Sequence, residues 1–308
     1  MDLIRAEEIN IQTEDQINLN GWAYWPGGKD ALDEKKPFLI LCHGLPPAPP
    51  ASEVLADGPP APAVLADEPP MPDVLADGPE GSAEPEEVLA DGPEGPVEPE
   101  EEDGGYAALA RQCTTRLGLP SFHFNYRGAG ASGGDFDLLG WCRDLTAFLD
   151  YWEQKRGVRQ GFTLWGFSAG GTVSAYVAAA DPRVKNLIIA ASPVSFREIF
   201  REEDLAELIL RFRHTGIIRD PDFPPEPRQW LQNIHTVEPL PYLASFAPRP
   251  LLIIHGSGDE LIPLHHAYRL YDAAGPGKEL IILPGARHQL RKEKEAVESC
   301  LSWLEKVL

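Results

Sequence analysis

A serine flanked by small residues is the part of this sequence best suited to chemistry. Ser168 occurs in Gly166-Phe167-Ser168-Ala169-Gly170, between an apolar run that predicts a strand and a stretch of small residues that predicts a helix. A sharp strand-to-helix turn would expose the hydroxyl at the carboxyl edge of a sheet, and the two glycines would let the flanking backbones approach each other. The positive end of the helix would favour negative charge that develops there. The pattern alone is common, but in this context it predicts a nucleophile.

A serine hydroxyl needs a base, and the base needs a group that fixes its tautomer. Asp259 follows the apolar run LLIIHGSGD, and His288 follows ELIILPGARH, so both lie at the carboxyl ends of predicted strands. Open α/β sheets place their sites at this edge. Glu260 is the alternative acid, and we favour Asp259. The weaker candidates for the base are the other seven histidines: His43, His123, His214, His235, His255, His265 and His266.

Short apolar runs alternate with helix-like stretches along most of the chain. Most runs are apolar at consecutive positions, which is typical of strands buried on both faces. Two segments rich in β-branched and aromatic residues, 9–13 and 17–25, precede them and predict an antiparallel hairpin. The alternation predicts a doubly wound, mostly parallel α/β sheet. The apolar runs are 37–44, 120–128, 161–170, 184–193, 249–260 and 278–288, and the helix-like stretches are 105–117, 138–155, 168–180, 263–273 and 292–307.

One connection, residues 193–247, is too long for a simple crossover. It carries two helix-like pieces, around 195–214 and 227–234. In the first piece, apolar residues recur at about helical spacing. We expect either an amphipathic helix that covers the core or a small lid over a ligand pocket. The recurring residues are Phe196, Ile199, Phe200, Leu205, Leu208, Ile209 and Phe212.

Residues 46–104 break every pattern described so far. VLADGP-like repeats begin at positions 54, 64, 74 and 88, and 15 of the 31 prolines of the chain lie in this tract. The tract has no aromatic residue and no Lys or Arg, so it offers too little apolar surface to offset the entropy of ordering. We expect a disordered, low-complexity acidic insertion within a single domain that spans 1–308.

Charge and composition narrow the range of partners. Residues 46–104 hold 17 Asp and Glu, so the other 249 residues carry a net charge of only −4, against −21 for the whole chain. This balance argues against nucleic acid and anionic membranes as partners. The first eight residues lack the features of a secretory signal, and no run approaches the roughly 18 apolar residues of a membrane span, so we expect a cytoplasmic protein.

Cysteines and cofactor motifs give no sign of a metal or redox site. Cys42, Cys113, Cys142 and Cys300 are widely spaced and predict buried thiols rather than a disulfide framework. Neither a metal-ligand pattern nor a nucleotide-binding glycine loop is complete. We therefore expect no metal and no cofactor.

Five motifs in order resemble those of the α/β-hydrolase superfamily, closest to its compact esterase and acyl-peptidase-like branch. The resemblance covers nearly the whole chain outside 46–104. It implies an α/β-hydrolase fold, and it implies that Ser168, Asp259 and His288 form a catalytic triad. The motifs are CHG at 42–44, NYRGAGASGG at 125–134, GFSAGG at 166–171, HGSGDELIP at 255–263 and GARH at 285–288.

The same resemblance implies where the oxyanion hole lies. In that family, the residue after His-Gly and the residue after the nucleophile each supply a backbone N–H group, which implies Leu45 and Ala169 here. The local sequence agrees, because Pro46 and Pro47 have no N–H to give. Leu45 is the last available donor before the acidic tract.

Taken with the chemistry of these residues, the resemblance predicts a serine hydrolase that cleaves a carboxylic ester or a related acyl bond of a small molecule through an acyl-enzyme. A serine peptidase or aminoacyl-amide hydrolase, a thioesterase and an acyltransferase are alternatives on the same fold. An alternative of another class is a hydrolase-like binding protein whose triad is idle. In the glycine-rich 125–134, we expect Arg127 to hold the loop rather than clamp a substrate.

Overall fold

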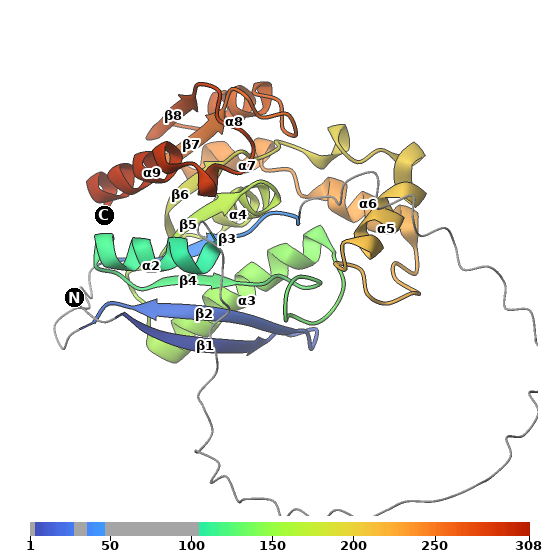
Figure 1. Cartoon of the computed structure of the whole chain (residues 1–308), viewed down its shortest axis with the longest axis horizontal. Coiled ribbons are helices and arrows are strands. Elements are labelled where there is room, and N and C mark those ends of the chain that lie inside the picture. Colours follow the sequence, from blue (N-terminus) through green and yellow to red (C-terminus); the bar gives the residue numbers. More distant parts are fainter. Residues whose placement is uncertain (1–3, 28–35, 47–104) are drawn as a thin grey trace, which may run out of the picture. The chain divides into compact units, whose positions relative to one another are not determined.

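The fold is a single eight-stranded sheet with helices on both faces (Figure 1). The computed structural model describes residues 4–27, 36–46 and 105–308, which fall within one compact unit. Apart from Pro46, the insertion expected at 46–104 lies outside the described residues.

The sheet is parallel over most of its width. Its strand order among the described residues is β1-β2-β4-β3-β5-β6-β7-β8. Strand β2 pairs antiparallel with β1 and β4, and all other pairs are parallel. The mostly parallel sheet and the opening hairpin are both confirmed. The strands are β1 (Arg5–Gln12), β2 (Asn18–Trp25), β3 (Phe38–Cys42), β4 (Ser121–Phe124), β5 (Phe162–Phe167), β6 (Val184–Ala190), β7 (Leu251–Gly256) and β8 (Lys278–Leu283).

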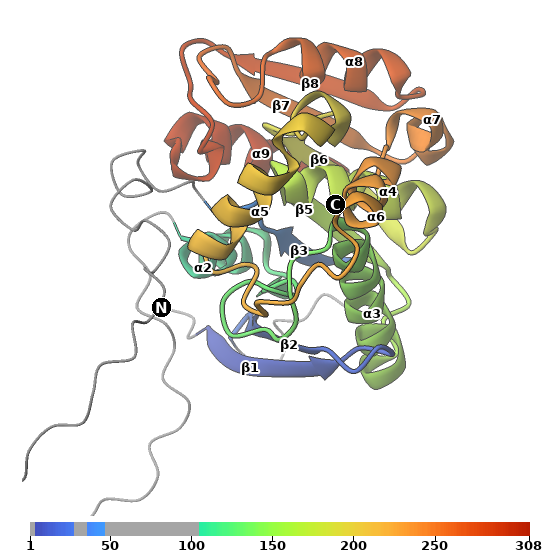
Figure 2. The same ribbon diagram turned by 90° about the vertical axis from the view of Figure 1, so that its right-hand side faces the viewer.

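The helices form two layers. Helices α2 and α9 lie on one face of the sheet, and α3, α4 and α8 lie on the other (Figures 1 and 2). Each layer has its own apolar core cluster. The helices are α2 (Tyr106–Leu117), α3 (Leu138–Arg156), α4 (Ala169–Ala180), α5 (Leu205–His214), α6 (Pro227–Thr236), α7 (Leu240–Leu243), α8 (His265–Ala273) and α9 (Lys294–Val307).

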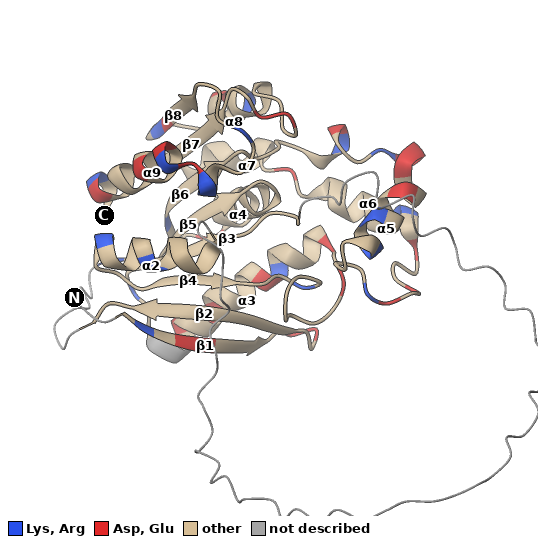
Figure 3. Ribbon diagram, in the orientation of Figure 1, with Lys and Arg blue, Asp and Glu red and all other residues tan. Residues whose placement is uncertain are grey.

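Strand β3 shows why continuous apolar runs become central strands. Ile40 and Cys42 belong to the core cluster under α3 and α4, whereas Leu39 and Leu41 belong to the cluster under α2 and α9. Because side chains alternate between the faces of a strand, both faces are apolar only if consecutive residues are. The central strands β3 and β5 carry no charged residue, whereas the edge strands β1 and β8 do (Figure 3).

The outer part of the segment 193–247, which holds α5 and α6, lies beyond the carboxyl ends of the parallel strands, whereas α7 packs against α4 and α8 (Figure 1). The helix-like piece predicted over 195–214 is wrong as one unit, because two 3-10 turns, η1 (Phe196–Glu198) and η2 (Glu202–Asp204), precede α5. The chain is extended at Arg201, with φ −98° and ψ 155°. Three acidic residues follow at once, and such residues favour the start of a new helix.

The second piece of the segment agrees with its prediction. The helix expected over 227–234 is confirmed as α6, which begins with Pro227 at a position where the missing N–H costs nothing. The structure adds α7 and the 3-10 turn η3 (Ala244–Phe246), which were not expected. Phe196, Phe200 and Phe212 are buried, so the segment contributes to the core.

The cysteines lie where their spacing predicted. All four are free and buried. Burial raises the pKa of Cys42 to about 11, so this thiol stays protonated at neutral pH. None of the described helices is both long enough and apolar enough to cross a membrane.

Candidate active site

Ser168 joins β5 to α4 through a strained turn. Its φ of 51° and ψ of −124° are a combination that residues with side chains rarely adopt. The N–H of Ser168 donates to the carbonyl of Ala190 at 2.9 Å, which ties the turn to the end of β6. The serine therefore lies at the carboxyl edge of the sheet, as its sequence context predicted.

Glycines let the backbones around this turn approach closely. A Cβ on Gly166 would stand 2.5 Å from the Cα of Gly171. A Cβ on Gly170 would collide with the carbonyl oxygens of Cys42 and His43 at the end of β3. The expectation that small residues are needed at 166 and 170 is confirmed.

The His-Gly turn after β3 packs directly on the serine. A Cβ on Gly44 would stand 2.8 Å from the Cβ of Ser168 and 3.5 Å from its Oγ. Leu45 follows in this turn and lines the same cavity as Ser168. Ala169 is the first residue of α4, so its N–H has no acceptor one turn earlier in the helix. Of the two residues predicted to supply oxyanion donors, Leu45 thus follows the glycine that packs on Ser168, and Ala169 follows Ser168 itself.

His43 fixes the orientation of this turn. The N–H of Tyr126 donates to Nε2 of His43 at 3.0 Å, so Nδ1 carries the ring proton and donates to the carbonyl of Gly44 at 2.7 Å. In a trans peptide the C=O and the next N–H point in opposite directions. The N–H of Leu45 therefore points away from the His43 ring.

His43 stays neutral in this position. Burial lowers its pKa to about 4, and the hydrogen bond with Gly44 opposes the shift only in part. The positive charge of Arg291 lowers the pKa further. A neutral ring is what allows Nε2 to accept the Tyr126 N–H.

Asp259 and His288 form a close pair. Nδ1 of His288 donates to Oδ2 of Asp259 at 2.8 Å, with the carboxylate side chain fully buried and that of His288 20% exposed. In the neutral ring, Nε2 is then the atom with a free lone pair. Asp259 Oδ1 accepts the N–H groups of Leu261 at 3.0 Å and Ile262 at 2.9 Å. The carboxylate is thus held by main-chain donors on one oxygen and by the imidazole on the other.

These contacts keep Asp259 ionised. Burial by itself would raise its pKa, but the hydrogen bonds from His288 and Ile262 outweigh burial, and the pKa lies below its ordinary value. His255 supports the same loop, because its Nε2 donates to the Ile262 carbonyl at 2.8 Å. Glu260, the alternative acid, is exposed and pairs instead with Arg287 at 3.0 Å.

One cavity of about 1050 Å³ brings Ser168 and His288 together. Within the described residues, no hydrogen bond joins the serine hydroxyl to His288. Such contacts are often long without substrate and tighten in the complex. Asp259 lies behind His288 and Ala169 behind Ser168, both buried.

The segment 193–247 supplies an apolar wall of this cavity. Phe196, Phe200 and Phe212 line it and belong to the core cluster, and Ile199 lines it and packs against that cluster. These residues therefore cover part of the core and border a ligand-sized space, and the role of the segment as a lid stays a prediction. Sequence reasoning missed Tyr106 and Arg291, which line the cavity from α2 and from the turn before α9. The sequence feature that could have pointed to Arg291 as a cavity residue is its position three residues after His288.

Arg127 holds the glycine-rich loop, as predicted. Its guanidinium is 7% exposed and bonds Asp144 Oδ1 at 2.7 Å and Asp15 Oδ2 at 2.7 Å. Its backbone N–H donates to Asp144 as well. Arg127 therefore positions the loop and does not face the cavity. Arg219, which sequence reasoning missed, ties the loop to the segment 193–247 by donating to the carbonyl of Gly130 at 2.8 Å.

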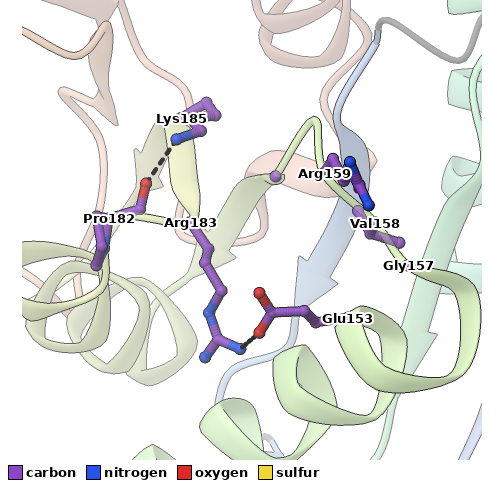
Figure 4. Close-up of a pocket in the computed structure, with 8 residues that line it drawn as sticks. Glu153, Gly157, Val158, Arg159, Pro182, Arg183 and Lys185 are labelled. Carbon is purple, nitrogen blue, oxygen red and sulfur yellow. Dashed lines mark hydrogen bonds and ion pairs between the residues drawn. The ribbon is translucent and has the colours of Figure 1, made fainter.

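A second hollow opens beside the amino-terminal ends of β5 and β6, away from Ser168 (Figure 4). Its main cation, Arg183, pairs with Glu153 at 2.7 Å, Asp150 at 2.6 Å and Asp181 at 2.6 Å. Lys185 donates to the carbonyl of Pro182 at 2.8 Å (Figure 4). The charge of Arg183 is thus neutralised within the protein, and both Glu153 and Lys185 are held by structural contacts.

One cluster has the residue types of a metal site. The ligand atoms of Glu198, His265 and His266 lie within 4.8 Å of one another. However, Arg269 pairs with Glu198 and lowers its pKa, so the carboxylate already has a cationic partner. His266 Nδ1 also accepts the N–H of Val194 at 3.3 Å. The cluster is better described as an ion-pair network than as a metal centre.

Comparison with known families fits this geometry. The sequence profile of the Prolyl oligopeptidase family (Peptidase_S9) matches residues 109–308. The chain belongs to this family. It is accordingly an α/β hydrolase, in agreement with the parallel sheet and the motifs along it.

Individual relatives are distant. An uncharacterized protein of Escherichia coli (strain K12), YfhR, is 28% identical over 170 residues, which are 54% of this chain and 52% of that protein. The chain thus spans about half the length of the curated relatives it matches. Among solved structures, the esterase Pf2001 of Pyrococcus furiosus has a TM-score of 0.58 at 16% identity, covering 99% of this chain and 93% of that one. Est1E of Butyrivibrio proteoclasticus, solved with ferulic acid, has a TM-score of 0.58 at 17% identity, covering 97% and 96%.

Proposed function

We propose that this hydrolase cleaves carboxylic esters of small acyl compounds through a serine acyl-enzyme. The observation that carries the proposal is the convergence of three features on one cavity: the strained turn at Ser168, the Asp259–His288 pair, and the His-Gly turn packed on the serine. Each of these features, taken alone, could serve only to stabilise the fold. Together they match the requirements of nucleophile, base and oxyanion donors.

In the first half-reaction, Oγ of Ser168 attacks the acyl carbon while Nε2 of His288 takes the hydroxyl proton. Asp259 holds the ring through Nδ1 and stabilises the imidazolium that forms. The N–H groups of Leu45 and Ala169 stabilise the oxyanion, each by roughly 3 kcal/mol. The tetrahedral intermediate then breaks its bond to the alcohol oxygen, which receives the proton from His288.

The second half-reaction restores the enzyme. His288 takes a proton from a water molecule, whose oxygen attacks the acyl carbon of the ester formed with Ser168. The bond to Oγ then breaks, His288 returns the proton to Ser168, and the carboxylic acid leaves. The apolar wall formed by Phe196, Phe200 and Phe212 supports this role, because it offers a surface for an acyl chain.

Amide hydrolysis is a second candidate, favoured by the match to a peptidase family. To separate the two, we would measure kcat/KM for 4-nitrophenyl butyrate, butyryl-CoA and aminoacyl 4-nitroanilides, each divided by its uncatalysed rate. The proposal predicts the largest value for the ester and a loss of at least 10³-fold in Ser168→Ala. A clear preference for the anilides would reject ester hydrolysis in favour of a peptidase, and preference for butyryl-CoA would indicate a thioesterase.

The proposal extends to the organisation of the chain. We propose that the segment 193–247 acts as a lid on a single hydrolase domain, supported by its apolar contribution to the cavity wall. Hydrogen exchange in α5 should slow when a fluorophosphonate occupies Ser168, and unchanged exchange would contradict a lid.

We also propose a cytoplasmic location, which the four free buried thiols support. Recovery of the protein in a secreted or membrane fraction would contradict it.

A further inference from the structure

The cavity that contains Ser168 carries more cations than carboxylates, although the chain has a net charge of −21. Two of these cations have partners: Arg287 pairs with Glu260 at 3.0 Å, and Arg219 donates to main-chain carbonyls. A positive field in a cavity raises the local concentration of anionic ligands. The charged residues of the lining are Arg211, Arg219, Arg287, Arg291, Lys292, Glu260 and Glu293.

Arg291 differs from the other cations of the lining in its surroundings. It belongs to the 3-10 turn η4 (Leu290–Lys292), which begins two residues after His288. Its Nε is buried and has no hydrogen-bond acceptor within the part of the chain that the structure describes. The guanidinium carbon lies 5.3 Å from the centre of the Tyr106 ring, which in turn meets the His43 ring edge-on at 6.2 Å.

The guanidinium thus lies close to the turn that carries Leu45. Its positive charge contributes to the lowered pKa of His43. Within the described residues, no carboxylate forms an ion pair with Arg291. Arg291 is half-buried, and its guanidinium keeps its charge at every accessible pH, so an anionic partner for it is favourable. The two terminal nitrogens of a guanidinium also form a pair of parallel donors that matches the two oxygens of a carboxylate. The missing counter-ion is therefore of a kind that a substrate can supply.

We propose that Arg291 binds a carboxylate of the substrate, so that the preferred substrates are small acyl compounds that carry a carboxylate away from the scissile bond. This inference deepens the proposed ester hydrolysis and rests on it. Arg291 touches the substrate in this account but takes no part in proton transfer. It acts as a specificity-determining residue.

The carboxylate could belong to the acyl part or to the leaving group. For the acyl part, the matched substrates are mono-4-nitrophenyl glutarate and its neutral methyl ester. For the leaving group, they are 4-acetoxybenzoate and its neutral methyl ester. In each pair the same bond is cleaved and the remote carboxylate is either charged or esterified. The kcat/KM of the charged ester divided by that of the neutral ester therefore measures the preference for the carboxylate.

The central test compares these ratios between variants. In the wild type, the charged member of one pair should be preferred by about tenfold or more. In Arg291→Gln, that ratio should fall to about one, even if the substitution also lowers kcat/KM for both esters equally. Arg291→Lys keeps the charge but loses the paired donors, and it should give an intermediate ratio. A melting curve of each variant shows that it is folded, and the lysine variant keeps the test valid if the glutamine variant unfolds.

A nearby cation outside the cavity serves as the control. Lys294 is exposed at the start of α9 and does not line the cavity, and Lys294→Gln removes the same charge. The ratio should be retained in this variant. An equal fall in Lys294→Gln and Arg291→Gln would show a diffuse field and overturn the assignment to Arg291.

A binding measurement separates this inference from the proposed function. Ser168→Ala should bind mono-4-nitrophenyl glutarate or 4-acetoxybenzoate in calorimetry, and the added Arg291→Gln substitution should weaken that binding at least tenfold. If neither charged ester is preferred while neutral esters are hydrolysed, the carboxylate site is wrong and the proposed function stands. If no ester is hydrolysed but the carboxylate still binds through Arg291, the proposed function is wrong and the site stands.

Discussion

Gly44 and Ser168 lie against each other, so that a Cβ on Gly44 would stand 2.8 Å from the Cβ of Ser168. The sheet register produces this contact. Cys42 on β3 pairs with Gly166 on the neighbouring strand β5, and two residues further along each chain lead to Gly44 and Ser168. Two turns far apart in the sequence thereby meet at the carboxyl edge of the sheet.

The substitution Gly44→Ala tests whether this contact shapes the site. The added methyl group must displace either the serine or the His-Gly turn, and loss of one oxyanion donor lowers kcat by about 10²- to 10³-fold. We expect a loss of that size in ester hydrolysis. The control is Gly118→Ala, because Gly118 has φ 65° and no atom within 4 Å of its added Cβ. It should cost about 1 kcal/mol of stability and leave kcat unchanged, and equal losses of kcat in both variants would contradict the account.

The orientation of the same turn depends on His43. Its Nδ1–H holds the Gly44 carbonyl and so directs the N–H of Leu45 away from the ring. His43→Leu should lower kcat by about 10²-fold with KM within about threefold, because the donor acts on the transition state. His43→Asn places an amide N–H near the position of Nδ1 and should recover part of kcat. Equal kcat in the two variants would show that His43 acts only through packing.

The loop after β4 depends on a buried ion pair. Arg127→Met would leave the carboxylate of Asp144 fully buried without its partner, and such a loss costs about 3–5 kcal/mol. We expect the free energy of unfolding in urea to fall by that amount. The double variant Arg127→Met/Asp144→Leu should lose less, since no charge is left buried. Asp15→Asn is the surface control: the Asp15 side chain is 41% exposed, and its loss should cost under about 1 kcal/mol.

Buried histidines make the fold sensitive to acid. Burial lowers the pKa of His43, His123 and His266 to about 4, from an ordinary value of 6.5. Between pH 6.5 and 4, the unfolded chain binds protons at these sites and the folded chain does not, so the free energy of unfolding falls as the pH falls through this window. His123→Gln should reduce the slope by about 1.4 kcal/mol per pH unit in the middle of the window. An unchanged slope in His123→Gln would contradict the assignment.

Local patterns in the sequence were enough to predict the sheet and the positions around Ser168. Consecutive apolar residues such as Leu39 and Ile40 leave a strand no polar face, so burial on both sides follows directly. The turn at Ser168 is equally local, because strand, turn and helix adjoin in the chain. Asp259 and His288 could be proposed from their places after predicted strands, although their 2.8 Å contact depends on the packing of two separate loops.

Other features depend on contacts that no local pattern reveals. The spacing of the apolar residues from Phe196 onward fits one helix, but the extended backbone at Arg201 interrupts the segment. The periodicity of apolar residues does not reveal such an interruption. Arg219 looks like an ordinary surface residue in the sequence, yet it holds the carbonyls of a loop about 90 residues away. The absence of a counter-ion for Arg291 among the described residues could be found only from their positions in the structure.

The central claim, that Ser168 is an activated nucleophile, is tested by labelling with a fluorophosphonate. Intact mass and peptide mapping should show one adduct on Ser168 in the folded protein and none in Ser168→Ala. Labelling should be much slower in Asp259→Asn, because the imidazole of His288 would lose its anionic partner. Denaturation before exposure should abolish the adduct. If folded protein is not labelled at Ser168 while it still hydrolyses esters, or if Ser168→Ala keeps its full activity, the account of this site is wrong.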